Sequence, residues 1–73
     1  MIRINDILDK FLENNPGFET DMIDRAYVYS ASVHAGQMRL SGEPYLSHPL
    51  EVAGILATLK LDAVSIAAGL LHG

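Results

Sequence analysis

Residues 39–53 read RLSGEPYLSHPLEVA, and the fold is decided where this stretch leads from one helical segment into the next. Gly42 and Pro44 are turn formers, so the first part of the stretch is expected to be a loop. Pro49 is tolerated in the first turn of a helix and favours an extended conformation for His48 before it. The stretch therefore predicts a loop that ends in a histidine at the start of a helix.

Composition limits what the rest of the chain can do. The 73 residues suffice for one small domain, so residues 1–73 are treated as a single domain. A net charge of −4 with only five Lys and Arg argues against a nucleic-acid partner, which needs a clustered basic face. The absence of cysteine excludes disulfides and thiolate metal sites and fits a reducing, cytoplasmic setting. Residues 1–10 alternate apolar and charged side chains, so neither a signal peptide nor a membrane span is expected there.

Two helices are predicted before the loop, over about residues 5–14 and 20–36. The first is indicated by apolar residues at helical spacing, namely Ile4, Ile7, Leu8, Phe11 and Leu12. Asn5 is its expected cap, and Pro16 prevents its continuation. Thr20 is the expected cap of the second helix, whose spacing places His34 on its inner face.

Two more helices are predicted after the loop, over about residues 48–60 and 63–72. The expected buried stripe of the third consists of Val52, Ile55, Leu56 and Leu59. Asp62 is the expected cap of the fourth, which is apolar on nearly every side and so expects burial all round. With no strand-like alternation anywhere, the predicted class is all-α.

Spacing alone gives a weak prediction of a metal site. His48 opens one helix and His72 closes the next, so the two imidazoles meet if these helices pack antiparallel. Imidazole is a good ligand for first-row metals, but a histidine beside proline is often a cap and a terminal histidine is often exposed. His34 is read as a structural histidine under this site, with metal ligation as the alternative. Arg39 by itself favours a solvated loop charge, and the three tyrosines favour packing.

Two phrases resemble a known family. Residues 26–56, AYVYSASVHAGQMRLSGEPYLSHPLEVAGIL, and residues 61–72, LDAVSIAAGLLH, closely resemble the hydrolase domain of the RelA/SpoT family. Members of that family make and degrade the alarmones guanosine tetra- and pentaphosphate. The resemblance implies the N-terminal part of an all-helical HD-type domain, which holds Mn²⁺ and removes the 3′-pyrophosphate of the alarmone.

The resemblance also implies roles for particular residues. The histidine of SHPLEVA, His48, and the histidine that begins the family's His-Asp pair, His72, correspond to metal ligands. Arg39 corresponds to the arginine that lies against the guanine base, with Leu40 and Ser41 beside it in the nucleotide-binding phrase. Leu40 stands where the family commonly has a basic residue. His34 corresponds to a supporting position rather than a ligand.

The resemblance stops at His72, because Gly73 stands where the family has its aspartate. The expectation is therefore a truncated domain without the downstream acidic residues, inactive or weakly active as a single chain. A second copy could supply the missing ligands, or the terminal carboxylate of Gly73 could replace the aspartate. The alternative is a non-catalytic module for self-association or regulation. Either way, the apolar fourth helix predicts a homo-oligomer of two or more chains.

Overall fold

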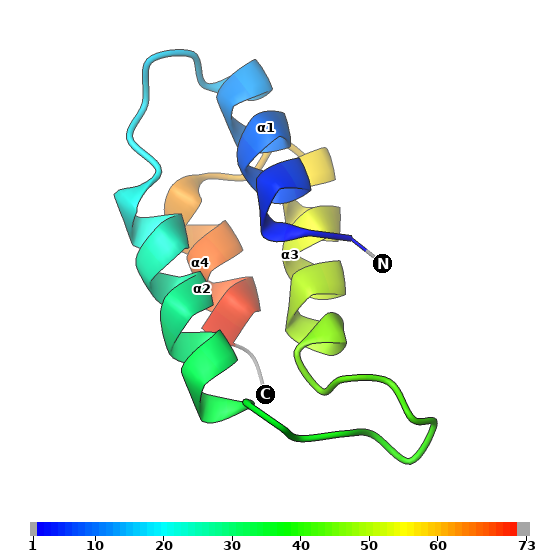
Figure 1. Cartoon of the computed structure of the whole chain (residues 1–73). Helices are drawn as coiled ribbons and strands as arrows, with labels where there is room; N and C mark the ends of the chain where they lie inside the picture. Colours follow the sequence, from blue (N-terminus) through cyan, green and yellow to red (C-terminus); the bar gives the residue numbers. More distant parts are fainter. Residues whose placement is uncertain (1, 72–73) are drawn as a thin grey trace.

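Four helices account for most of residues 2–71, the part of the chain that the computed structural model describes (Figure 1). In chain order they are α1 (Ile4–Asn14), α2 (Asp21–Val33), α3 (Ser47–Thr58) and α4 (Ala63–Leu71). Within residues 2–71 the only pairing of β type is one isolated antiparallel bridge between Met38 and Pro44. The predicted all-α class is confirmed.

Helix α4 holds the bundle together. It packs against both α2 and α3, while α1 lies along α3 (Figure 1). The buried apolar side chains come from all four helices: Ile7, Phe11, Ile23, Ala26, Leu50, Ala53, Ala57, Ile66, Ala67 and Leu70. Each large aliphatic side chain buried in this way contributes about 1.5–3 kcal/mol. Because α4 touches two helices that do not otherwise depend on each other, its buried face joins the two halves of the fold.

The apolar stripe predicted for α1 is the face by which this helix packs. Ile7 and Phe11 are buried, and Ile4 and Leu8 are partly buried against the same core. The cap differs from the prediction, because the helix begins at Ile4 rather than after Asn5. The backbone N–H of Arg3 donates to Oδ2 of Asp6 at 2.9 Å, and the N–H of Asp6 donates to the Arg3 carbonyl at 3.0 Å. This reciprocal pair does the capping in place of Asn5.

The buried face of α3 was predicted only in part: Val52 and Leu56 are partly buried, and Leu56 packs against the core. Ile55 and Leu59 are exposed, whereas the buried residues of this helix are small or lie near its start: Ser47, Pro49, Leu50, Ala53, Gly54 and Ala57. The reason is close helix packing, since a Cβ built on Gly69 of α4 would lie 3.4 Å from the Cα of Ala53. Small side chains on α3 let the backbone of α4 approach, and Ile55 and Leu59 remain exposed to solvent.

The turn between α3 and α4 is tightly specified. The N–H of Leu61 donates to the carbonyl of Leu56 at 3.2 Å, and the N–H of Lys60 donates to that of Ala57 at 3.0 Å. This is the bond pair of a Schellman motif, and it requires a left-handed residue, which here is Lys60 with φ of 62°. Asp62 then caps α4 as predicted, because its Oδ1 accepts the N–H of Ser65 at 2.9 Å.

Two helix boundaries also differ from those expected. Helix α2 ends at Val33 rather than at Gly36, because the chain turns at His34 and Gly36 has a positive φ of 75°. Helix α3 begins at Ser47, so His48 lies inside its first turn and not in the extended segment before it. Leu46 is already in the right-handed helical region, with φ of −59° and ψ of −23°, which allows this earlier start.

Candidate functional site

Three helix ends meet at one end of the bundle. Helix α2 runs toward this end, the connection 34–46 crosses it, and α3 starts from it; α4 then returns to it after the short α3–α4 turn (Figure 1). The C-terminal ends of α2 and α4 therefore lie at the same end of the molecule as the N-terminal end of α3. Chemistry-bearing residues that are far apart in sequence are gathered here by topology.

His48 lies at this end, in the first turn of α3. Its backbone N–H donates to the carbonyl of Tyr45 at 3.2 Å, and its side chain is partly buried. Pro49 behind it is buried and fixes the backbone from which the imidazole projects. The predicted partner, His72, and the terminal carboxylate of Gly73 lie outside the described residues. The last described residue, Leu71, brings α4 to the same end of the bundle as His48.

The loop that carries Arg39 is closed by its own backbone. The N–H of Arg39 donates to the carbonyl of Glu43 at 2.8 Å, and the N–H of Gly42 donates back to the Arg39 carbonyl at 2.9 Å. A third bond, from the N–H of Tyr45 to the carbonyl of Gln37 at 3.0 Å, joins the two arms of the loop at its base. Gly42 has φ of 87°, a conformation that other residues adopt only with strain. The loop is thus a short hairpin of fixed shape.

Arg39, Leu40 and Ser41 project from the tip of this hairpin into solvent. All three are exposed, and together with Met38 and Tyr45 they line a shallow recess of about 420 Å³. Among residues 2–71 the Arg39 guanidinium has no carboxylate within ion-pair distance. An exposed planar cation over a partly apolar recess suits stacking on a flat ligand.

His34 and Tyr45 form a contact at the base of the hairpin that sequence reasoning missed. Their rings are stacked, with centroids 4.5 Å apart and planes inclined by 28°. His34 is the C-terminal cap residue of α2, so it lies just past the helix and not on its inner face as predicted. Its Nδ1 lies 3.1 Å from Oε1 of Gln37. The spacing of VHAGQ and EPY held no signal for this pair, since the contact depends on the path of the loop.

Comparison with known proteins identifies this arrangement. The sequence pattern of the HD domain family matches residues 26–73, which include the C-terminal part of α2, the hairpin, α3 with His48, and α4. The chain belongs to the HD domain family. A helical bundle with no strand in its described part, and with a histidine at a shared end of three helices, agrees with this membership.

Known relatives of this HD domain are RelA/SpoT-type enzymes. A protein of Myxococcus xanthus named GTP pyrophosphokinase is 67% identical over 58 residues, which are 80% of this chain and 8% of that protein. The GTP pyrophosphokinase rsh of Brucella ovis is 42% identical over 72 residues, 99% of this chain and 10% of its own length. The bifunctional (p)ppGpp synthase/hydrolase RelA of Mycobacterium tuberculosis is 46% identical over 57 residues, 78% of this chain and 8% of its own.

The described residues fit part of a metal site. Membership of the HD domain family indicates metal dependence, yet no three His, Cys, Asp or Glu side chains are grouped for a metal within residues 2–71. The hydroxyls of Ser30 and Ser47 are buried near the shared end of the bundle, and neither has a hydrogen-bond partner in that part of the chain. Buried hydroxyls normally find partners. The imidazole of His48 is of a type that first-row metals accept as a ligand.

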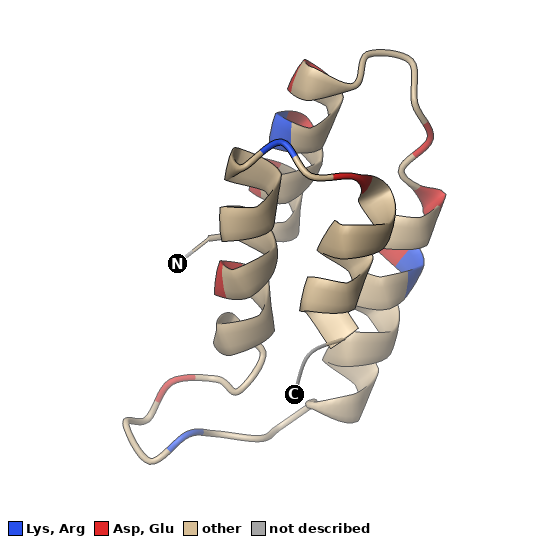
Figure 2. Cartoon of the chain, turned by 180° about the vertical axis from the view of Figure 1, so that it is seen from behind, with Lys and Arg blue, Asp and Glu red and all other residues tan. Residues whose placement is uncertain are grey.

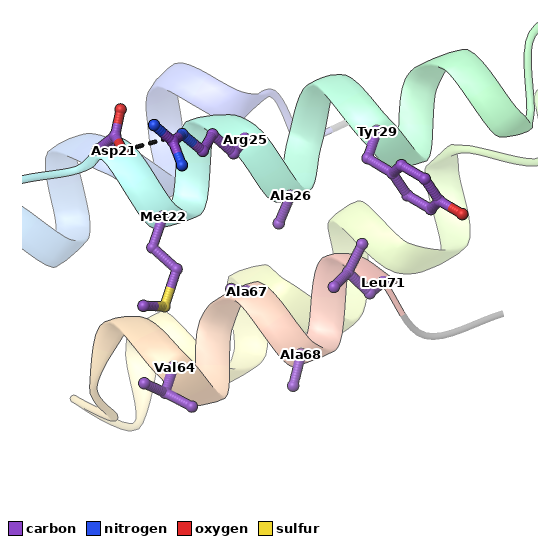
Figure 3. A pocket seen from close by; sticks show the side chains of 9 residues that line it. All are labelled: Asp21, Met22, Arg25, Ala26, Tyr29, Val64, Ala67, Ala68 and Leu71. Atoms are coloured by element: carbon purple, nitrogen blue, oxygen red, sulfur yellow. Dashed lines mark ion pairs between the residues drawn. The ribbon is translucent and has the colours of Figure 1, made fainter.

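A second recess lies away from this end, between α2 and α4 (Figure 3). It has a volume of about 550 Å³ and is bordered by Asp21 and Arg25, whose side chains form an ion pair of 3.0 Å. Met22 points toward Val64 across the groove, and the remaining lining residues are Ala26, Tyr29, Ala67, Ala68 and Leu71. The exposure of Val64, Ala68 and Leu71 shows that α4 is covered on one side only.

Charged residues are spread over the described part of the chain and not gathered on one face (Figure 2). The five Lys and Arg residues are divided among the start and middle of α1, α2, the hairpin and the α3–α4 turn (Figure 2). Acidic residues lie on the same helices, where Lys10 pairs with Glu13 and Arg25 pairs with Asp21. None of the helices in residues 2–71 combines the length and apolar character that crossing a bilayer requires.

Proposed function

We propose that this HD domain provides the first half of the site of a cytoplasmic guanosine-3′,5′-bis(diphosphate) 3′-pyrophosphohydrolase. The observation that carries the proposal is the placement of His48 and the Arg39 hairpin on consecutive segments at the shared end of three helices. A metal ligand and a nucleotide contact must be neighbours for this reaction. The name of the Mycobacterium tuberculosis relative, which includes (p)ppGpp hydrolysis, supports the same substrate.

Each residue has a defined part in the proposal. His48 and His72 supply imidazole nitrogens to a divalent cation, with Mn²⁺ as the expected ion and oxygen ligands contributed by groups outside the described residues. A cation in such a site polarises phosphoryl oxygen. Arg39 stacks its guanidinium on the guanine base, and the backbone at Leu40 and Ser41 borders the nucleoside. Leu40 offers the phosphates no positive charge, unlike the basic residue that the family commonly has at this position.

Manganese binding tests the ligand assignment directly. Titration of the chain with Mn²⁺, followed by the electron paramagnetic resonance signal of the free ion, should show binding that both His48→Ala and His72→Ala weaken. His34→Ala is the matched control, since it removes a histidine at the same end without removing a proposed ligand. Equal binding by the parent chain and both ligand variants would refute the assignment.

Turnover tests the reaction. Pyrophosphate released from guanosine tetraphosphate should depend on Mn²⁺ and should be lost in His48→Ala and in His72→Ala. Because residues 2–71 contain no grouped set of three metal ligands, we expect turnover to be slow. Release that continues in both variants would show that another group carries the reaction, and the proposed site would be wrong.

We propose, as a second function, self-association through the α2–α4 groove. The supporting observation is the apolar lining of the groove, in which Met22, Tyr29, Val64 and Leu71 are all exposed. In a symmetric dimer, α4 of each copy would lie in the α2–α4 groove of the other, so that one contact covers both grooves. Such a contact would also bring two copies of the site into one particle.

Two valines make a matched test of this association. Val64 lines the groove and is 61% exposed, while Val28 on α2 does not line it and is 64% exposed. Val64→Asp should convert the assembly to a monomer in sedimentation velocity, because a carboxylate in a closed apolar contact is costly. Val28→Asp should leave it unchanged. A monomeric parent chain, or equal behaviour of the two variants, would exclude this interface.

A further inference from the structure

An aromatic contact at the base of the hairpin joins the segment that carries Arg39 to the end of α2. The outgoing arm of the hairpin ends at Tyr45, whose ring stacks on His34 with centroids 4.5 Å apart. His34 follows α2 directly and Tyr45 lies two positions before the start of α3, so the contact joins the end of one helix to the segment that leads into the next. Offset stacking of this kind adds to the stability gained from burial alone.

Gln37 fixes the orientation of the histidine in this contact. Its side-chain Nε2–H donates to the carbonyl of Val33 at 3.2 Å, so its Oε1 is the atom turned toward His34. That oxygen can only accept, and it lies 3.1 Å from Nδ1 of His34. Nδ1 therefore carries a proton, and the imidazole is held in one rotamer under the tyrosine ring. The carbonyl of Gln37 in turn accepts the N–H of Tyr45 at 3.0 Å.

These contacts close a ring around the base of the hairpin. From Val33 the chain of contacts runs through Gln37 and His34 to Tyr45, and a backbone bond returns it to Gln37. Among residues 2–71, the exposed tip has two internal backbone bonds and no other, one between Arg39 and Glu43 and one between Gly42 and Arg39. The tip is therefore fixed within itself, and its position relative to α2 and α3 depends on the base.

We infer that His34, Gln37 and Tyr45 form a clamp that sets the position of Arg39, and that Tyr45 is a positioning residue for nucleotide recognition. The part that concerns the nucleotide rests on the proposed function, whereas the clamp itself rests on the contacts alone. When the stack is broken, the hairpin separates from the end of α2 while the helices stay packed. Arg39 then occupies many positions, and ligand binding has to restrict them again.

Trypsin measures release of the hairpin without any ligand. The bond after Arg39 lies in the hairpin, whereas the bond after Arg25 lies inside α2 and is cut only when the helix unfolds. Tyr45→Leu should speed cleavage after Arg39 about two- to tenfold, the range expected for loss of one aromatic pair, with the rate after Arg25 unchanged. Tyr45→Phe keeps the ring and should cleave like the parent chain.

A double variant tests whether the two rings act through one contact. His34→Leu should speed cleavage after Arg39 as much as Tyr45→Leu does, and the double variant should be no faster than either single one. Equal rates after Arg39 in Tyr45→Leu and the parent chain would overturn the clamp. A rise after both Arg39 and Arg25 would overturn it as well, because the stack would then support the whole fold and not the hairpin.

Binding of guanosine tetraphosphate tests whether the clamp matters for nucleotide recognition, separately from whether the clamp exists. Tyr45→Leu should weaken binding by about the factor by which it speeds cleavage, and Tyr45→Phe should restore it. Arg39→Lys should weaken binding, and Tyr45→Leu should speed cleavage after Lys in this background by the same factor as it speeds cleavage after Arg39 in the parent chain. If the parent chain does not bind the nucleotide, the proposed function is wrong. The proteolysis rates alone then show whether the clamp holds the hairpin.

Discussion

Replacing Gly69 by alanine should destabilise this bundle, although alanine is the better helix former. The propensity difference favours alanine by about 1 kcal/mol. The structure opposes it, because the new Cβ would lie 2.7 Å from Cδ1 of Leu56, with Cγ1 of Val52 and Cα of Ala53 each 3.4 Å away. Carbon atoms prefer about 3.5–4.0 Å, so Leu56 must move against partly buried neighbours. Overpacking of this kind costs about 1–3 kcal/mol, and we expect a net loss of about 1 kcal/mol.

Gly54 is the matched control for this experiment. It is also a buried glycine in a helix, but its added Cβ would meet only the side chain of Ile2, in the extended segment before α1. Ile2 is partly buried against the core but belongs to the terminal segment, and no backbone atom lies near the added Cβ, so Gly54→Ala should cost less than Gly69→Ala. Thermal unfolding followed by circular dichroism measures both variants, and 1 kcal/mol corresponds to about 4–8 °C in Tm for a domain of this size.

The cause of the loss can be tested separately. In a Leu56→Ala background the obstructing methyl group is gone, so Gly69→Ala should become neutral or stabilising. Gly69→Ala that is as stable as Gly54→Ala in the parent chain would refute the packing argument. So would a loss of stability that persists when Leu56 is already alanine.

Three further perturbations follow from the structure. Lys60→Gly should stabilise the fold by about 0.5–1 kcal/mol in urea unfolding, because Lys60 has a positive φ in the Schellman turn; Lys60→Ala should bring no such gain. The N–H of Ser65, and next its side chain, hold the pKa of Asp62 below its usual range. A lowered folded-state pKa means that the carboxylate stabilises the fold above its ordinary pKa and loses this effect as the pH falls through the folded value. Asp62→Ala should therefore lower Tm at pH 7, and the difference from the parent chain should begin to shrink below about pH 4 and be smallest once the pH is below the folded-state pKa. Leu70, with 0% exposure, and Leu71, with 53%, are adjacent leucines, so Leu70→Ala should cost about 2–5 kcal/mol and Leu71→Ala less than about 1 kcal/mol by the same unfolding measurement.

The sequence predicted the features that depend on local chemistry. The apolar spacing of α1 and the cap at Asp62 were predicted because each depends on residues within one or two helical turns. The chain order of the helices also follows from such local signals, with Pro16 and Pro49 marking boundaries. For the candidate site, family resemblance singled out Arg39 and His48 in advance, and the structure places both at one end of the bundle.

What depends on neighbouring helices was not predictable in this way. The buried face of α3 was misjudged in part because hydrophobicity favours large residues, whereas close packing selects small ones, with Ala53 against Gly69 of α4 and Gly54 against Ile2. The stack of His34 on Tyr45 was missed because it forms across a loop whose path is set by backbone bonds. Both errors concern three-dimensional geometry, namely how closely two helices pack and which path a loop takes. The pattern of residue types along one segment does not determine either.

The way in which the hairpin is built has a consequence for how its ligand preference can change. Backbone bonds and the residues at the base determine its shape, while the side chains of Arg39, Leu40 and Ser41 contribute almost nothing to holding it together. A leucine can therefore occupy position 40 at no cost to folding, and so could a charged residue. If the tip binds a nucleotide as proposed, single substitutions at these positions can change its ligand preference without changing the stability of the hairpin.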